Sequence, residues 1–134
     1  MQISEVMHKD IKFANINDSV KKVAEMMKSD DIGSVPVMDG NKPVGIVTDR
    51  DIVIKCVADG ADLNASIKSA MTTDVVCIKQ SQSLEEASKL MAQRQISRVV
   101  VVDDSDKPVG IVSLHDLTQE DEDLAEETVN RIKQ

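Results

Sequence analysis

The chain has 134 residues, and its 24 acidic side chains outnumber its 16 basic ones, which gives a formal net charge of −8. An acidic chain with a single aromatic side chain, Phe13, has neither a basic surface for phosphates nor a platform on which bases stack, so nucleic-acid binding is not expected. No apolar run approaches the ~18 residues of a membrane span, the first residues do not form a secretory signal, and two cysteines do not make a disulfide framework. We therefore expect a soluble, cytoplasmic protein with reduced thiols and an aliphatic core.

The most informative feature of the sequence is an internal repeat. When the chain is laid on itself, Met7 coincides with Met71 and Met27 with Met91, and KPVGIVTDRDI then coincides with KPVGIVSLHDL after one inserted residue. The expected organisation is a first repeat over 1–60, a linker over 61–69, a second repeat over 70–118 and an acidic tail over 119–134, expected to be helical.

The first repeat carries signals for five helices or strands and one turn. The expected elements are, in chain order, an extended segment at 11–16, a helix capped by Ser19, a strand at 34–39, a turn at 39–41, a strand that opens at Pro43, and a helix over 48–60 that ends near Gly60. A serine N-cap followed by apolar residues at helical spacing predicts the first helix. Two β-branched runs around an Asp-Gly-Asn turn predict a hairpin.

The second repeat carries the same signals. The expected elements are an extended segment at 75–80, a helix capped by Ser83 and Glu86, a strand at 98–103, a turn at 103–106, a strand that opens at Pro108, and a helix over 113–125. Each repeat is therefore β-α-β-β-α. A repeat of this size buries little surface alone, so we predict an α+β fold in which two repeats pack as one body about a pseudo-two-fold axis.

The paired segments GIVTDRD and GIVSLHD, each after a strand and a turn, resemble the motifs of tandem CBS domains, the regulatory pair called a Bateman module. The resemblance covers about 1–117. It implies a stand-alone, non-enzymatic sensor that binds an adenosine ligand (AMP, ADP, ATP or S-adenosylmethionine) in clefts between the repeats and changes their geometry. It also implies a homodimer formed through the helices, with an unidentified regulated protein as partner. No cofactor is required, although the acidic residues after Asp116 could recruit Mg²⁺ beside a nucleotide.

A nucleotide site needs a carboxylate for the ribose, donors at a helix start for phosphate, and an apolar slot for the base. Asp51 and Asp116 are the expected ribose ligands, and Thr48 and Ser113 the expected phosphate donors. Before the middle strand, where the resemblance implies a basic phosphate ligand, the second repeat has Arg98, and the first departs from the pattern with Ser34. The other expected contacts are the polar Arg50 and His115 and the apolar Ile11, Phe13, Ile32, Pro36, Val75, Cys77, Ile96 and Val99.

Two interpretations of the motif stay open. A Ser or Thr followed three residues later by an acid is also a capping box, which needs no ligand. If Thr48–Asp51 and Ser113–Asp116 only cap helices, the chain would be a structural or interaction module that acts through homodimerisation and its acidic tail. If they bind nucleotide, the sites should be unequal, with the Arg98/Asp116 site favoured for ADP or ATP. Scattered His and Cys residues predict neither a metal site nor catalysis.

Overall fold

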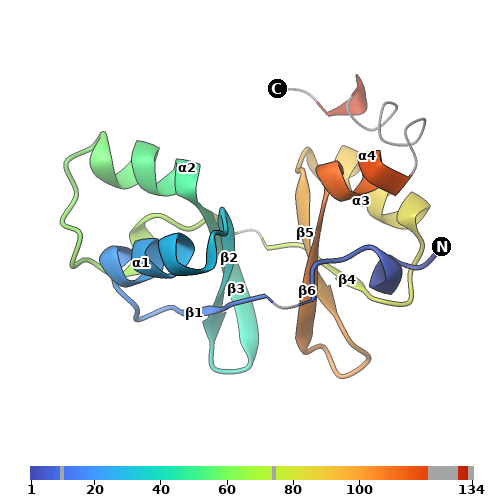
Figure 1. Ribbon diagram of the computed structural model, residues 1–134, viewed down its shortest axis with the longest axis horizontal. Coiled ribbons are helices and arrows are strands. Elements are labelled where there is room, and N and C mark those ends of the chain that lie inside the picture. The colour runs from blue at the N-terminus through green and yellow to red at the C-terminus, as the bar shows by residue number, and fades with distance from the viewer. Residues whose placement is uncertain (10, 74, 121–129, 133–134) are drawn as a thin grey trace. The chain divides into compact units, whose positions relative to one another are not determined.

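The computed structural model describes residues 1–9, 11–73, 75–120 and 130–132 (Figure 1). It confirms the predicted α+β class and the order β-α-β-β-α in both repeats. The first set comprises β1 (Ala14–Asn15), α1 (Val20–Asp30), β2 (Ser34–Asp39), β3 (Lys42–Thr48) and α2 (Asp49–Ile52), which continues as a π-helical turn over Val53–Val57. The second set comprises β4 (Cys77–Lys79), α3 (Leu84–Arg94), β5 (Arg98–Val102), β6 (Pro108–Ser113) and α4 (Leu114–Glu120). Short 3-10 turns cover Ile3–Glu5 and Ile67–Ser69.

The predicted caps form at the two long helices. Ser19 Oγ accepts a hydrogen bond from the Lys22 amide at 3.1 Å at the start of α1. At α3, Ser83 Oγ accepts from the Glu86 amide at 3.1 Å, and the Glu86 carboxylate accepts from the Ser83 amide at 3.2 Å. Hydrogen bonds from the Gln82 side chain and the Ser83 amide lower the pKa of Glu86. Local polar chemistry therefore fixes where both helices begin.

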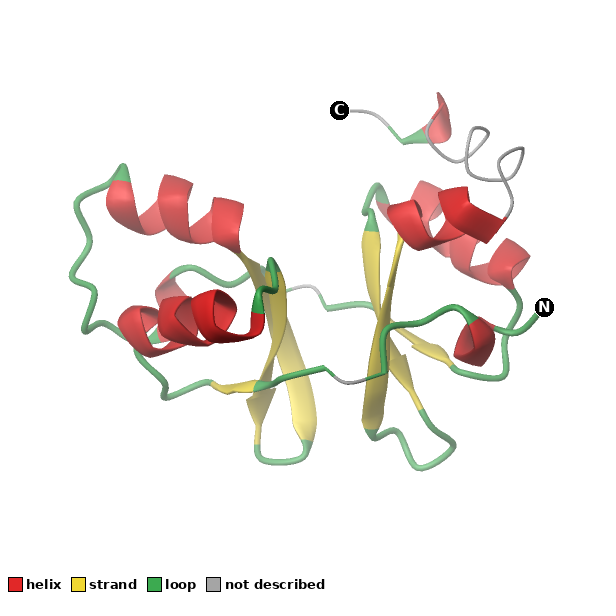
Figure 2. Cartoon of the chain, viewed as in Figure 1, coloured by secondary structure: helices red, strands yellow, loops and turns green. Residues whose placement is uncertain are grey.

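Each repeat forms its own three-stranded sheet. The strand orders are β1-β2-β3 and β4-β5-β6, with a parallel pair followed by an antiparallel hairpin in each case. In both repeats the two helices lie on the same face of the sheet (Figure 2). Alternate strand residues such as Val35 and Val37, or Val99 and Val101, are fully buried beneath these helices in aliphatic cores. The residues between them are buried too: Pro36 is buried and Val100 has no exposed surface, so the middle strands do not alternate between a buried and an exposed face.

The two compact units of the structure do not coincide with the two sequence repeats, because each unit includes a segment that precedes the other repeat. The first-repeat unit is Lys12–Val75, and the second-repeat unit combines Met1–Ile11 with Val76–Gln134. Ile3 is fully buried in the core of the second-repeat unit, whereas Ile67, from the stretch predicted to be a linker, is fully buried in the core of the first-repeat unit. The predicted boundaries follow the repeat in sequence, but each core is completed by a residue from the segment that precedes the other repeat. The packing of the two units about a pseudo-two-fold axis stays a prediction.

A glycine in each hairpin lets the exchanged segment cross β3 or β6. In the second-repeat unit, His8 and Ile111 exchange backbone hydrogen bonds of 2.9 and 3.1 Å. A Cβ added at Gly110 would lie 2.7 Å from the His8 carbonyl oxygen and 2.7 Å from Met7 Sδ. The glycine of PVGIV is therefore needed because another backbone passes where its side chain would be.

The same crossing is found in the first-repeat unit. Thr72 and Ile46 exchange backbone hydrogen bonds of 2.8 and 3.1 Å. A Cβ at Gly45 would lie 2.7 Å from the Thr72 carbonyl oxygen and 2.8 Å from Met71 Sδ.

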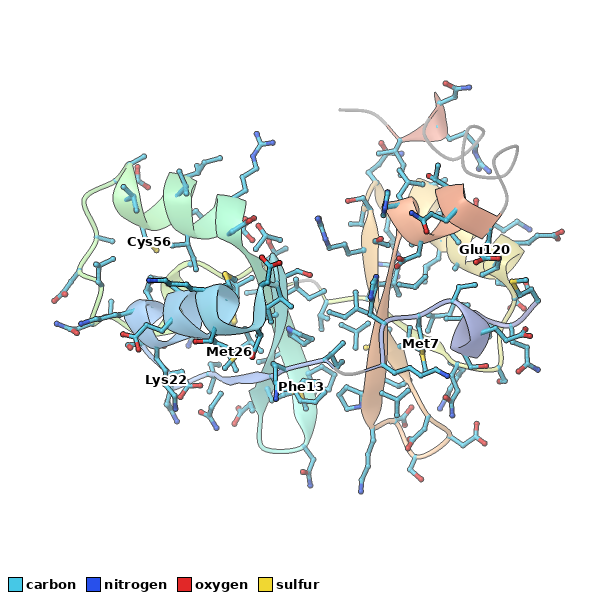
Figure 3. All side chains as sticks on the ribbon, viewed as in Figure 1. Met7, Phe13, Lys22, Met26, Cys56 and Glu120 are labelled. Carbon is cyan, nitrogen blue, oxygen red and sulfur yellow. The ribbon has the colours of Figure 1, made fainter. Side chains whose placement is uncertain are left out.

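In the second-repeat unit, the segment that runs beside β6 can be found in Figure 3 by the label of Met7.

Part of the predicted tail is described. The Gln95 side chain donates a 3.0 Å hydrogen bond to the Arg131 carbonyl oxygen, and Ile132 packs against the core of the second-repeat unit. Leu124 and Val129, two other apolar residues of the tail, lie outside the described residues. Among the helices of the described segments, none is both long and apolar enough to cross a membrane.

Candidate functional site

In the first repeat, the predicted site residues meet where β3 enters α2. Thr48 pairs with Ser34 across the hairpin and is the N-cap of α2. Its Oγ1 accepts from the Asp51 amide at 3.0 Å, and Asp51 Oδ2 accepts from the Thr48 amide at 3.0 Å. The other carboxylate oxygen, Oδ1, lies 3.7 Å from Lys55 Nζ. Thr48 and Asp51 therefore form a capping box at this junction, and one carboxylate oxygen is not used by the cap.

The second repeat has the same junction with an additional partner. Arg98 pairs with Ser113 across the hairpin, as Ser34 does with Thr48. Asp116 Oδ2 accepts from the Ser113 amide at 2.7 Å and from the Ser113 hydroxyl at 3.0 Å, while Ser113 Oγ lies 3.2 Å from the Asp116 amide. Asp116 Oδ1 lies 2.9 Å from His8 Nε2. Sequence reasoning missed His8, because nothing local to the residue connects it with a motif more than a hundred positions away.

A surface hollow of about 350 Å³ lies at this second junction. Its lining brings together three predicted residues, Arg98, Ser113 and His115, and adds Ser97, Leu114 and Thr118. This volume is within the range of small-molecule sites. The Leu114 amide donates to the Ser97 carbonyl oxygen at 2.9 Å, which ties the start of α4 to the start of β5. The hollow therefore combines a guanidinium, a hydroxyl and an imidazole at one helix start.

The residues predicted for the base slot differ in how deeply they are buried. Val99 and Pro36 are buried, and Val99 belongs to the core of its unit. Ile32 and Ile96 are half-buried and pack against the cores of their own units. These positions are accounted for by packing, with or without a ligand.

The segments expected to form the other wall of the base slot are divided between the units. Ile11 belongs to the second-repeat unit, whereas Phe13, which is 39% exposed, belongs to the first-repeat unit. Val75 and Cys77 are separated in the same way. Neither pair lies within a single unit, because the chain passes from one unit to the other between its two members.

Cys77 lies in a different hollow from Arg98. Its neighbours there are Gln82, Glu86 and Lys89, among others on β4 and α3. Partial burial raises the pKa of the Cys77 thiol, and the nearby Asp106 carboxylate raises it further. The thiol is therefore protonated at neutral pH, which is the less reactive form.

The chain belongs to the CBS domain family, whose model matches residues 3–57 and again 67–123. It is similar to the CBS domain-containing protein YhcV of Bacillus subtilis, with 36% identity over 115 residues that cover 86% of this chain and 81% of YhcV. The resemblance of GIVTDRD and GIVSLHD to the motifs of tandem CBS domains is thus confirmed, and the two matches establish a tandem pair.

Two solved structures have a similar fold. The CBS domain pair of protein MJ0100, solved in complex with 5′-methylthioadenosine and S-adenosyl-L-methionine, has a TM-score of 0.77 and 28% identity, and the match covers 90% of this chain and 94% of that one. A CBS domain protein from Pyrobaculum aerophilum, complexed with AMP, has a TM-score of 0.81 and 22% identity over 97% of this chain and 99% of that one. CBS pairs are regulatory modules, in agreement with the prediction that this chain is not an enzyme.

Proposed function

We propose that this chain is a regulatory module that binds an adenosine ligand at the strand-to-helix junctions of its CBS repeats. The observation that carries the proposal is the hollow at the start of α4, where Arg98, Ser113 and His115 meet. It is supported by the MJ0100 domain pair, whose two bound ligands both contain adenosine. The proposal includes AMP, ADP, ATP and S-adenosylmethionine as candidate ligands, with or without Mg²⁺. It also includes binding in clefts between the repeats, a change of repeat geometry on binding, and a cytoplasmic location.

The side chains at the two junctions suit different parts of a nucleotide. Asp51 and Asp116 supply carboxylate oxygens that accept from ribose hydroxyls, as acids do in dinucleotide folds. Arg98 supplies a guanidinium, which binds phosphate oxygens through two parallel hydrogen bonds. Because Ser34 replaces that cation in the first repeat, we propose that a di- or triphosphate prefers the second junction.

The first test compares how much a ligand raises the melting temperature in the parent and in two variants. A ligand at a hundred times its dissociation constant stabilises the parent by about 2.7 kcal/mol. We expect Asp51→Ala and Asp116→Ala each to lose the part of this stabilisation that comes from its own junction. Differential scanning calorimetry with AMP, ADP, ATP and S-adenosylmethionine, with and without Mg²⁺, measures the shift.

The control must separate a lost ligand from a lost cap. Both aspartates take part in helix-start hydrogen bonds, so alanine there costs about 1 kcal/mol without any ligand. Glu86→Ala removes the same type of box at α3, outside the proposed sites, and should keep the full ligand shift. If the aspartate variants respond to every nucleotide as the parent does, the ribose assignment is wrong. If the nucleotide-free parent responds to none, the chain is an interaction module.

We also propose that the module forms a homodimer through the helix that follows β3. After α2 the chain exposes three apolar side chains within one and a half turns: Val53 is 57% exposed, Ile54 48% and Val57 63%. Exposed apolar side chains that are clustered mark interaction surfaces more often than isolated ones do. The family resemblance implies that the partner covering these side chains is a second copy of this chain.

The dimer proposal predicts a change in oligomeric state on charge insertion. We expect the double variant Val53→Glu/Val57→Glu to be monomeric at concentrations where the parent is dimeric, because two buried carboxylates in an interface are strongly unfavourable. Sedimentation velocity measures this directly. Leu63→Glu, which places an acid on a 48% exposed leucine outside the helix, is the matched control and should stay dimeric. A dimeric double variant would locate the interface elsewhere.

A further inference from the structure

The carboxylate of Asp116 is covered by a side chain from the first residues of the chain. His8 Nε2 lies 2.9 Å from Asp116 Oδ1, and only 10% of the Asp116 side chain is exposed, compared with 70% of the His8 side chain. An ionised carboxylate only accepts hydrogen bonds, so the imidazole is the donor. The backbone bridge between His8 and Ile111 holds the backbone of His8 against β6.

The first repeat has a different side chain at the equivalent position. Thr72 bridges Ile46 as His8 bridges Ile111, so Thr72 and His8 occupy matching places in the two units. Among the described residues, Thr72 makes no side-chain hydrogen bond to Asp51. The two junctions therefore share their caps and differ in whether an imidazole covers the aspartate.

The number of hydrogen bonds that each carboxylate can still accept follows from these contacts. Each carboxylate oxygen accepts about two hydrogen bonds. Asp116 Oδ2 already has two donors, the Ser113 amide and hydroxyl, and Oδ1 has His8, so within the described chain one acceptor place remains. Among the described residues, Asp51 Oδ2 has one donor, the Thr48 amide, and its Oδ1 has only Lys55 at 3.7 Å, so three places remain there.

A ribose presents two adjacent hydroxyls, and both must donate if one carboxylate is to bind them. Asp51 has acceptor places for both hydroxyls, whereas Asp116 has a place for only one of them while His8 stays. We propose that His8 is a gate, a positioning residue that must leave Asp116 before a ribose can bind at the second junction. This inference rests on the proposed function. It adds that Asp51 can bind a ribose directly, whereas Asp116 can do so only after His8 has moved.

The gate makes the second site selective in a defined way. A ligand with phosphates gains contacts with Arg98 that offset the loss of the His8–Asp116 hydrogen bond, whereas a nucleoside gains none. Adenosine should therefore prefer the Asp51 site, and a polyphosphate should be the ligand that opens the Asp116 site. Binding of a ligand at the second junction would then be detected as the displacement of His8 from Asp116.

The experiment isolates the second site by using Asp51→Ala as the background and adenosine as the probe. Isothermal titration calorimetry compares Asp51→Ala with Asp51→Ala/His8→Ala. We expect the added His8→Ala change to tighten adenosine binding about 3- to 10-fold, the equivalent of one net hydrogen bond. Asp51→Ala/His8→Gln, which can keep a side-chain donor near Asp116, should fall between the two. Because His8 is mostly exposed, its replacement leaves the core intact.

A second measurement follows the gate itself. In the free parent, nuclear Overhauser contacts should link the His8 ring protons with the Asp116 β-protons, and saturating ATP should remove them. Equal adenosine affinity with and without His8, or contacts that persist when ATP is bound to Asp51→Ala, would overturn the gate and leave the proposed function standing. If none of adenosine, AMP, ADP, ATP and S-adenosylmethionine binds to the parent or to any of these variants, both the gate and the proposed function are wrong.

Discussion

Replacing Ile3 by alanine is expected to lower the free energy of unfolding of the second-repeat unit by about 2–5 kcal/mol, the range for truncating a fully buried isoleucine. Ile3 has no exposed surface and packs with Leu84, Val101 and Leu117, although it lies near the start of the chain. The loss combines the transfer of apolar atoms with the cavity they leave. Urea unfolding followed by circular dichroism measures it.

Hydrogen exchange shows which of the two units is destabilised. Ile3→Ala should accelerate exchange in α3 and β5 and leave β2 and β3 unchanged, because the Ile3 side chain fills only the core of the second-repeat unit. Ile67→Ala is the matched variant and should produce the reverse pattern. Met1→Ala, at a position that is 67% exposed, controls for any change near the start of the chain. A cost below about 1 kcal/mol for Ile3→Ala would contradict the segment exchange.

Gly110→Ala is the second substitution with a large expected effect, about 3 kcal/mol. The added methyl group would lie 2.7 Å from a backbone carbonyl oxygen, which is closer than real Cβ contacts allow. Overpacking usually costs about 1–3 kcal/mol, and the cost here should reach the upper end because one obstacle is backbone rather than a flexible side chain. The same reasoning applies to Gly45→Ala in the other unit. Thermal unfolding of each variant checks the prediction.

Gly33→Ala is the control for these two glycines. The three atoms nearest to its added Cβ would all belong to the end of the Asp49 side chain, the closest at 3.3 Å, and that carboxylate can move aside. We expect a change within about 0.5 kcal/mol, as for other surface substitutions. If Gly110→Ala were equally mild, the segment around His8 would not be held against β6 in solution.

Much of the fold could be predicted because its signals are local. Ser19 and Ser83 begin helices through bonds to residues three positions away, and Gly40 adopts the positive φ of 62° that its turn requires. The duplicated GIVTDRD and GIVSLHD segments placed both junctions correctly at the ends of β3 and β6. Such features depend on neighbours along the chain, which a single sequence displays.

The parts that escaped prediction depend on distant contacts. Ile3 and Ile67 match each other in the repeat, and nothing in either residue says which core it fills. His8 could be paired with Asp116 only once the first segment was known to lie beside β6. A repeat makes this harder, because similar residues offer two equivalent places to pack.

The exchange of segments also sets an order of events during synthesis. The first-repeat unit, Lys12–Val75, is continuous, so every residue of its core has been made once Val75 has been added. The second-repeat unit must instead join Met1–Ile11 to strands that the ribosome makes much later, so its first segment waits while a whole unit is translated. Closing that long loop costs entropy, and such distant contacts slow folding. A nascent chain should therefore carry one finished unit and, ahead of it, an unpaired segment whose Ile3 and Met7 are still exposed to chaperones.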